Sequence, residues 1–330
     1  MQHSWMWLGF AAVVTVMMAL DLGVFHRRAH TVRPREALLW SSVWVTLAAI
    51  FAAVLWRLDG HQTAVEFAAG YVVEQALSVD NLFVFLLLFR YFKVPAALQH
   101  RVLFWGIFGA LVLRAIMIGA GSVLLGQFHW IIYIFGAFLL FTGIKMLVQD
   151  DDEIEPANNP VLRLVRRLVP VTTHFEGDHF FTRAAWGPDQ IVRTIATPLF
   201  VVLVLVETTD VVFAVDSIPA VFGVTRDPFV VYSSNIFAIL GLRSMYFLLA
   251  AVMHRFWMLK PGLSLVLMFV GAKMLVENFW HIPTLLSLGV IIAILIGAVA
   301  LSLAFPRPMA SLPAEPIPPS PPVAAPSGSR

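Results

Sequence analysis

The sequence predicts an all-α polytopic membrane protein with about nine transmembrane helices around a 3+3 inverted-repeat core. Hydrophobic residues make up 59% of the 330 residues and charged residues only 13%, whereas a soluble domain averages about 25% charged residues. The apolar residues gather in runs of about 20, the length that crosses a bilayer core of about 30 Å. Two blocks of the chain also repeat the same charged motifs in the same order.

These apolar runs are hydrophobic on all sides, which is typical of helices surrounded by lipid and by other helices. Tryptophans stand near the ends of many runs, as expected at a membrane interface. We therefore expect a lipid bilayer as a partner and no nucleic acid. The predicted spans are 5–25, 37–56, 64–89, 103–125, 130–149, 197–220, 229–253, 261–279 and 284–305.

Basic residues alternate between the successive loops of this arrangement. The first loop carries four arginines between residues 27 and 35, whereas the second carries only Arg57. The alternation continues along the chain, and basic loops favour the cytoplasmic side of a membrane. We therefore expect the N-terminus outside and the C-terminus in the cytoplasm. A count of eight spans would break the alternation.

The spans divide the chain into segments. The long internal loop opens with an acidic run that we interpret as a solvated face, and the tail holds nine prolines, which indicates disorder. The predicted segments are two peripheral transmembrane helices (1–61), a first three-helix repeat (62–149), a cytoplasmic loop (150–195), a second three-helix repeat (196–281), a last transmembrane helix (282–305) and a disordered Pro-rich tail (306–330).

The two three-helix units share three charged markers in one order. An acid, a second acid six residues later and a small polar residue occur at 74–81 and again at 210–217. A Leu-Arg pair follows in mid-span, and then a Gly-x-Lys-Met-Leu motif. Because each unit has an odd number of spans, the second copy enters the membrane from the opposite side, and such repeats place a substrate site near the midplane. Duplication could also merely enlarge a structural protein.

Five of the carboxylates inside the predicted spans lie in or next to the repeated acidic motifs. Each costs about 2.5–3.5 kcal/mol near the bilayer centre, so such groups are usually functional and face the protein interior. The six-residue spacing turns the second acid of each motif about 120° from the first on a regular helix. That acid must therefore meet a neighbouring helix, or the helix must break, for example near Pro219. The five are Glu74, Asp80, Glu207, Asp210 and Asp216.

The donors of these motifs are all hard oxygen groups, without His or Cys. Oxygen-only sites suit Mn²⁺, Mg²⁺ or Ca²⁺ rather than Zn²⁺ or Cu⁺. We therefore expect no cofactor beyond a transported divalent ion, Mn²⁺ or alternatively Ca²⁺ or Mg²⁺. The candidate metal ligands are Glu74, Asp80, Asn81, Asp210, Asp216 and Ser217, with Ser78, Glu207 and Thr209 as additional candidates.

Four basic residues offer a structural alternative, in which the acids are balanced by ion pairs that hold helices together. Arg114 and Arg243 lie in mid-span and are expected to pair with an acid. Lys145 and Lys273 lie near span ends, from which a lysine can extend to the membrane surface. Both interpretations hold if an arginine neutralises the empty site and yields to an arriving cation.

Other chemistry has little support in the sequence. There is no cysteine, which excludes disulfides and thiol catalysis, and there is no phosphate-binding glycine loop, GxSxG or HExxH motif. The His and acidic residues of 174–179 fit a polar loop better than a metal site. We therefore do not expect an enzyme.

At these motifs the sequence resembles the TerC family, and within it the Alx-like branch. The resemblance spans about residues 5–305 and is carried by the segments 20–27, 74–81, 197–200, 207–221 and 234–243. It implies a bacterial inner-membrane protein related to LysE-type exporters, and it associates this branch with manganese export and alkaline pH. Under this resemblance the six candidate ligands become candidate Mn²⁺ ligands.

Two hypotheses follow. The first is export of Mn²⁺ from the cytoplasm, with optional coupling to protons, by alternating access of the two repeats. The second is a non-transporting membrane scaffold in a tellurium-resistance or membrane-stress complex, in which the acids serve structural pairing. The sequence does not define the oligomeric state.

Overall fold

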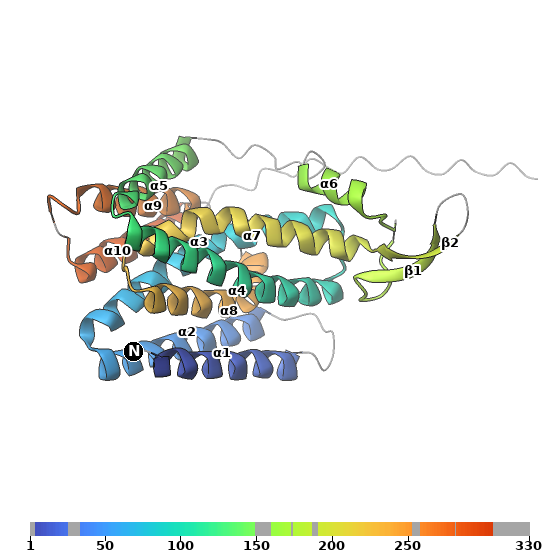
Figure 1. Cartoon of the computed structure of the whole chain (residues 1–330), viewed down its shortest axis with the longest axis horizontal. Helices are drawn as coiled ribbons and strands as arrows, with labels where there is room; N and C mark the ends of the chain where they lie inside the picture. Colours follow the sequence, from blue (N-terminus) through green and yellow to red (C-terminus); the bar gives the residue numbers. More distant parts are fainter. Residues whose placement is uncertain are drawn as a thin grey trace, which may run out of the picture.

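The computed structural model describes residues 4–25, 34–148, 160–172, 174–186, 191–252, 258–280 and 282–305. Within these ranges the long helices form one bundle of roughly parallel and antiparallel rods (Figure 1). Each predicted span corresponds to one long helix. These helices are α1 (Ser4–Phe25), α2 (Pro34–Asp59), α3 (His61–Tyr91), α4 (Ala96–Gln127), α5 (Ile131–Val148), α7 (Pro198–Phe222), α8 (Pro228–Val252), α9 (Leu259–Val276) and α10 (Thr284–Ala304).

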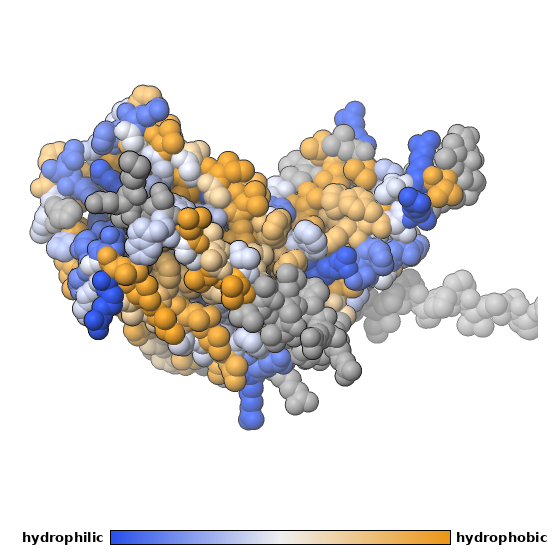
Figure 2. Space-filling model, turned by 60° about the horizontal axis from the view of Figure 1, so that its bottom comes forward, coloured by the Kyte–Doolittle hydropathy of each residue, from blue (hydrophilic) through white to orange (hydrophobic). Residues whose placement is uncertain are grey.

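The outer surface of the bundle is suited to lipid. Among the described residues, 8 helices are long and apolar enough to cross a membrane, and α1 adds the shorter apolar stretch Trp5–Met18. Large apolar side chains cover the visible face of the bundle (Figure 2), and Phe141 and Ile296 are each 64% exposed. So much exposed apolar surface is unusual for a soluble monomer. The prediction of a polytopic helical membrane protein is confirmed.

The two predicted repeats interlock instead of lying side by side. Helix α5 packs along α9, α3 along α8 and α4 along α7, while α3 also meets α7 and α4 meets α8. Exchanging α3, α4 and α5 with α7, α8 and α9 converts α3–α8 into α4–α7 and leaves the other three pairs unchanged. This pairing is the one that a repeat predicts, and the inversion of the second copy stays a prediction. Helices α1, α2 and α10 pack around this core.

The long internal loop contains more structure than the sequence analysis predicted. Its described part holds the short helix α6 (Pro160–Leu168) and an antiparallel hairpin of β1 (Phe181–Trp186) and β2 (Ile191–Ala196). The hairpin lies at one end of the bundle, called here the hairpin end (Figure 1). The predicted acidic run and the Pro-rich tail lie outside the described residues.

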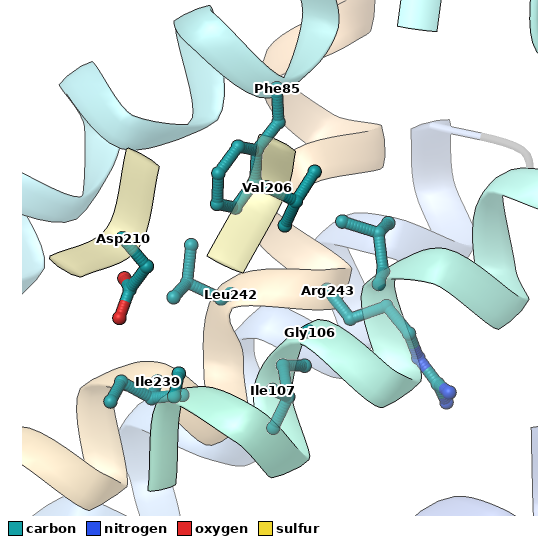
Figure 3. Close-up of a pocket in the computed structure, with 10 residues that line it drawn as sticks. Phe85, Gly106, Ile107, Val206, Asp210, Ile239, Leu242 and Arg243 are labelled. Atoms are coloured by element: carbon teal, nitrogen blue, oxygen red, sulfur yellow. The ribbon is translucent and has the colours of Figure 1, made fainter. Parts of the chain in front are cut away.

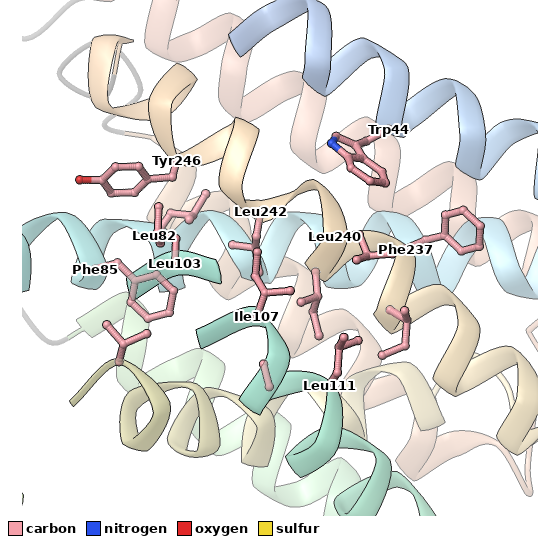
Figure 4. Close-up of a cluster of buried hydrophobic side chains, with 14 of the residues drawn as sticks. Trp44, Leu82, Phe85, Leu103, Ile107, Leu111, Phe237, Leu240, Leu242 and Tyr246 are labelled. Carbon is pink, nitrogen blue, oxygen red and sulfur yellow. The ribbon is translucent and has the colours of Figure 1, made fainter. Parts of the chain in front are cut away.

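Two clusters of buried apolar side chains hold the bundle together. The larger joins α2, α3, α4, α7 and α8, and Figure 4 shows part of it, including Trp44, Phe85 and Phe237. The second joins α3, α5, α7 and α9 through residues such as Leu139 and Val270. Helices α3 and α7 contribute to both clusters, so their polar residues are held inside a packed interior.

Glycines allow α5 and α9 to approach backbone to backbone. A Cβ atom on Gly271 would lie 2.7 Å from the carbonyl oxygen of Gly136 and 2.7 Å from the amide nitrogen of Leu140. A Cβ atom on Gly143 would lie 2.9 Å from the carbonyl oxygen of Ser264. Small residues at helix contacts are a common basis of packing in membranes. We call this contact the glycine seam.

Substitution of a glycine in the seam should therefore destabilise the protein. We expect Gly271→Ala to lower the free energy of unfolding by about 1–3 kcal/mol, because the added methyl group meets backbone atoms that cannot move aside. Gly289→Ala on α10 is the matched control, since a Cβ atom there has nothing within 4 Å. Equal thermal unfolding of both variants in detergent would argue against the seam.

Candidate functional site

Arg114 on α4 lies at the centre of the bundle with a side chain that is fully buried, at 0% exposure. Its Nη2 donates to Asp210 Oδ1 at 2.9 Å and its Nε donates to Asp210 Oδ2 at 3.2 Å. Its Nη1 forms an ion pair with Glu74 Oε1 on α3. A two-pronged arginine–carboxylate contact is among the strongest hydrogen-bonded pairs in proteins.

The same guanidinium also contacts two neutral side chains. Its Nη1 donates to Ser217 Oγ on α7 at 3.3 Å and to Asn235 Oδ1 on α8 at 3.2 Å. Four helices, two from each predicted repeat, therefore meet at one side chain. We call Arg114, Glu74, Asp210, Ser217 and Asn235 the Arg114 cluster.

Helix geometry explains which polar residues reach the interior. Glu74, Ser78 and Asn81 lie four and seven residues apart, so they share one face of α3. Their exposed fractions are 0%, 1% and 2%. Asp210 and Ser217 share a face of α7 in the same way, and they are 3% and 1% exposed. The first acid of each motif and the small polar residue after the second acid therefore face inward.

The second acid of the α7 motif points elsewhere. Helix α7 is continuous from Pro198 to Phe222 and includes Pro219, so the structure shows no break there. Asp216 instead meets a neighbouring helix, where its Oδ1 accepts a hydrogen bond from the Thr142 hydroxyl of α5 at 3.4 Å. It lies outside the Arg114 cluster. The side chain of Asp80 lies outside the described part of the structure.

The additional candidate ligands on α7 have other surroundings. Glu207 fills the space left by the missing side chain of Gly109 on α4. Its Oε2 is buried and has no hydrogen-bond partner among the described residues. The Thr209 hydroxyl donates to the Leu205 carbonyl of its own helix at 2.7 Å, so its proton is engaged locally.

Among the described side chains, Arg114 contacts two of the candidate acids, Glu74 and Asp210. Figure 3 shows the Arg243 guanidinium directed away from Asp210, across a small apolar pocket. Lys145 is exposed on α5. Lys273 on α9 is only 6% exposed and lines a polar cavity near the end of α9, and its extension to the membrane surface stays a prediction.

Several buried polar atoms near the cluster lack a hydrogen-bond partner among the described residues. Buried polar groups in proteins are nearly always hydrogen-bonded, so these atoms are the ones that a polar ligand would satisfy. They belong to both predicted repeats, and two of the residues are in the cluster itself. The atoms are Glu74 Oε2, Ser78 Oγ, Asn81 Nδ2 and Asn235 Nδ2.

With Arg114 between the acids, the described residues contain no group of three or more His or acidic side chains placed to hold a metal ion. The acids of the α6–β1 segment form separate surface pairs, His174 with Glu176 at 2.7 Å and His179 with Asp178 at 3.3 Å. The described arrangement is therefore a cluster in which one arginine partly compensates two carboxylates. A cation could take its place only if the guanidinium moved away from the carboxylates.

Sequence reasoning missed Asn235. The available signal was the polar triplet Ser233-Ser234-Asn235 in the middle of an apolar span, and all three residues are 0% exposed. Ser233 and Ser234 use their hydroxyls to donate to carbonyl oxygens of their own helix at 3.3 Å and 3.1 Å. Only the longer amide of Asn235 reaches across to the guanidinium.

The fold and the cluster define an integral membrane protein whose helical core encloses an ionic centre. The chain belongs to the TerC family of integral membrane proteins, whose family model matches residues 59–309. It is 52% identical over 298 residues to an uncharacterized membrane protein of Myxococcus xanthus, with 90% of this chain and 92% of that protein covered. It is also 52% identical over 300 residues to Alx of Escherichia coli K12, with 88% and 92% covered. The name of that relative proposes a membrane-bound redox modulator.

A more distant relative is an uncharacterized membrane protein of Rickettsia bellii, 37% identical over 290 residues, with 88% of this chain and 94% of that protein covered. No solved structure matches the chain. The family assignment thus comes from sequence similarity along most of the chain, and the arrangement of the site comes from the structure described above.

Removal of the positive charge of Arg114 should strongly destabilise the protein. We expect Arg114→Gln to lower the free energy of unfolding by about 3–5 kcal/mol, because it leaves two buried carboxylates without their cation. Arg101→Gln is the control, since the side chains of the Arg101–Asp178 pair are 33% and 56% exposed, and exposed pairs contribute about 0–1 kcal/mol. Equilibrium unfolding in mixed detergent should separate the two variants. Similar losses would show that the Arg114 pairs add little stability.

Proposed function

We propose that this protein is an inner-membrane divalent metal-ion transporter that exports Mn²⁺ from the cytoplasm. The observation that carries the proposal is the Arg114 cluster. Two carboxylates and a ring of oxygen donors, from both predicted repeats, meet at one buried point. An inverted-repeat transporter places its substrate site in the same position.

Charge compensation suggests how the cluster would bind an ion. Arg114 contributes one positive charge against the two negative charges of Glu74 and Asp210. A divalent cation would neutralise both carboxylates by itself, so the carboxylates would stay paired if the guanidinium moved out of the cluster. Ser217 Oγ and Asn235 Oδ1, which now accept from Arg114, would be released as further oxygen ligands. Mn²⁺, Mg²⁺ and Ca²⁺ all accept such donors.

The route to the hairpin end is closed in this structure. A pocket of about 10 Å³ borders Asp210 there, which is room for about one water molecule. Its lining is mostly apolar and includes Phe85, Val206 and Leu242, which face one another in Figure 3. Passage of an ion would require these helices to separate, as alternating access of the two repeats would allow.

The proposed transporter also has an orientation in the membrane and a driving force for export. From the loop charges we expect the hairpin end and the C-terminus in the cytoplasm of a bacterial cell, and the N-terminus outside. Carboxylates that release a cation can accept protons, so protons moving inward could drive export. We propose Mn²⁺ among the divalent ions because the family resemblance points to it. The donor set alone fits Mg²⁺ and Ca²⁺ equally well.

The alternative function is a non-transporting membrane scaffold. It is favoured by the finding that Arg114 already holds two of the candidate ligands, as a structural ion pair would. In that case the protein would organise a tellurium-resistance or membrane-stress complex without moving ions. A redox role, as proposed by the name of the Escherichia coli relative, could not use thiols of this chain, because its 330 residues include no cysteine.

Ion flux distinguishes these functions. In proteoliposomes we expect wild-type protein to move Mn²⁺, and Asp210→Asn to lower the rate at least about tenfold, which corresponds to about 1.4 kcal/mol. Asp178→Asn is the matched control, because the Asp178 side chain is 56% exposed outside the bundle. Asp216→Asn should reduce flux less than Asp210→Asn, since Asp216 lies outside the Arg114 cluster.

Three outcomes have distinct meanings. Equal flux through wild type and Asp210→Asn would show that the Arg114 cluster is not part of the transport site. Absence of flux for Mn²⁺, Mg²⁺ and Ca²⁺ in wild type would favour the scaffold. Faster flux of Mg²⁺ or Ca²⁺ than of Mn²⁺ would support the transporter function and assign it a different substrate ion.

A further inference from the structure

A polar cavity of about 340 Å³ opens at the end of the bundle opposite the hairpin. Helix α7 runs from the hairpin to this cavity (Figure 1), and the cavity lies where α9 ends and α10 begins. We call it the α9–α10 cavity. The ionisable side chains that line it are Glu66, Arg226, Asp227, Lys273 and Glu277.

Lys273 brings a buried positive charge to this cavity. It lies in the last turn of α9, where the helix dipole favours a cation, but it is only 6% exposed. It forms no hydrogen bond or ion pair with any described residue. Because a buried ammonium normally has a direct partner, Lys273 is suited to bind a negatively charged group that enters the cavity.

Two of the three acids in the lining are already engaged by the protein. Both carboxylate oxygens of Glu66 accept hydrogen bonds, Oε1 from Gln62 Nε2 at 2.8 Å and Oε2 from the Thr225 hydroxyl. Asp227 Oδ1 accepts from the Phe229 amide at 2.8 Å and so caps the start of α8. These two carboxylates therefore have structural roles and leave few acceptor positions for a ligand.

Glu277, the third acid, is half-buried and forms no hydrogen bond or ion pair with any described residue. It follows Lys273 by four residues, which is about one helical turn of 5.4 Å. The α9–α10 cavity thus offers one ammonium and one carboxylate, each without a direct partner. A simple anion would be attracted by Lys273 but repelled by Glu277. A ligand that carries both an anionic group and an ammonium would match both side chains.

Two uncapped helix starts add hydrogen-bond donors for the anionic group. Helices α3 and α10 begin without a side-chain cap, and Gln62 and Thr284 of their first turns line the cavity. The first amides of a helix have no partner within the helix and favour phosphate and other anions. Thr284 Oγ1 accepts from Gln62 Nε2 at 3.3 Å and donates to no described residue, so its own proton remains for a ligand.

Exposed tryptophans indicate that the cavity lies at the level of the lipid head groups. Trp56 lies in the last turn of α2, Trp130 directly before α5 and Trp280 shortly after α9, and they are 60%, 59% and 75% exposed. All three lie at the end of the bundle that holds the cavity, because α2 leads into α3 and α5 runs antiparallel to α9 along the glycine seam. Exposed tryptophans gather at membrane interfaces.

We propose that the α9–α10 cavity binds the head group of an ethanolamine phospholipid, with its phosphate against Lys273 and the start of α10 and its ammonium against Glu277. Two carbon atoms join the charged groups of phosphoethanolamine, a spacing comparable with the one helical turn between Lys273 and Glu277. Its eight non-hydrogen atoms need less than about 240 Å³, if each is given the 30 Å³ of a water molecule. Arg226, which is exposed, adds a second positive charge for the phosphate.

This inference goes beyond ion transport, because it concerns how the membrane affects the stability of the protein. A head group in the cavity would contact Lys273 of α9, Thr284 of α10 and Gln62 of α3, and would therefore hold these three helices together. A ligand that binds the folded protein stabilises it by an amount that grows with its concentration. The lipid composition of the membrane would thus affect the stability of this end of the bundle.

The test compares two lipids that differ in the ammonium. Native mass spectrometry of the full-length protein in detergent would measure the binding of phosphatidylethanolamine and of phosphatidylglycerol, which has the phosphate but no ammonium. We expect phosphatidylethanolamine to bind at least about tenfold more tightly, because Glu277 attracts an ammonium and repels an anion. Equal affinity for the two lipids would overturn the proposal. Displacement of the lipid by an equal concentration of inorganic phosphate would indicate a free-anion site and would also overturn it.

Two variants separate the two halves of the site. Lys273→Met should weaken the binding of both lipids about tenfold, because it removes the ammonium that meets the phosphate. Glu277→Gln should weaken phosphatidylethanolamine about tenfold and strengthen phosphatidylglycerol, because the repulsion of an anion is lost. A purely structural effect of Glu277→Gln would weaken both lipids alike and would contradict the site. Unchanged binding in both variants would also overturn it.

Matched controls lie elsewhere in the chain. Lys260→Met removes a lysine from the opposite end of α9, and Glu176→Gln changes a half-exposed acid in the segment before β1. Neither should alter the preference for phosphatidylethanolamine. Equal losses in Lys260→Met and Lys273→Met would show a general attraction between the protein and lipid phosphates and would contradict a local site.

Thiol labelling covers the case in which a charge variant folds poorly. Because the chain contains no cysteine, Ile282→Cys introduces a single thiol into the lining of the cavity. We expect a water-soluble thiol reagent to label it more slowly in nanodiscs of phosphatidylethanolamine than in nanodiscs of phosphatidylglycerol, because a bound head group covers the cavity. Equal labelling rates in the two lipids would count against the site.

Discussion

The structure depends on one buried ion pair system, in which a single arginine holds two carboxylates from two helices. Arg114, Glu74 and Asp210 are almost completely buried, so each would be costly to place in the membrane by itself. Together they allow α3, α4 and α7 to meet at a polar point inside an apolar bundle. The same interaction fixes the relative position of the two predicted repeats. Any ion that enters this point must compete with the guanidinium.

The two ends of the bundle differ around this centre. Toward the hairpin, apolar side chains such as Phe85 and Val206 leave a pocket of only about 10 Å³. Toward the other end, a polar cavity of about 340 Å³ is lined by three acids, by Lys273 and by Arg226. A repeat would give similar ends if its copies were identical. Differences between the predicted copies, such as buried Lys273 and exposed Lys145, therefore account for the difference between the two ends of the bundle.

Much of the fold could be predicted from the sequence, because a membrane span needs only length and hydrophobicity. The inward faces of α3 and α7 were also predictable, since Glu74 and Ser78 or Asp210 and Ser217 follow helical periodicity. Periodicity did not show where Arg243 or Lys273 would point, because long side chains follow the space that neighbouring helices leave. The β1–β2 hairpin was missed because two strands of 6 residues give little signal beside spans of about 20 residues. Asn235 was missed because a short polar triplet in a span is also a common feature of helix packing.

The glycine seam has a mechanical consequence. Where helices pack through interdigitating side chains, sliding or rotating one helix against the other requires many rotamers to change. Where Gly136 faces Gly271 the two backbones meet directly, and few side chains resist a small change of crossing angle. The seam joins one helix of each predicted repeat, so the two repeats can tilt against each other at this contact. A tilt of a few degrees there would leave Lys273, two residues from Gly271, almost in place and would displace the start of α9, about 18 Å away along the helix.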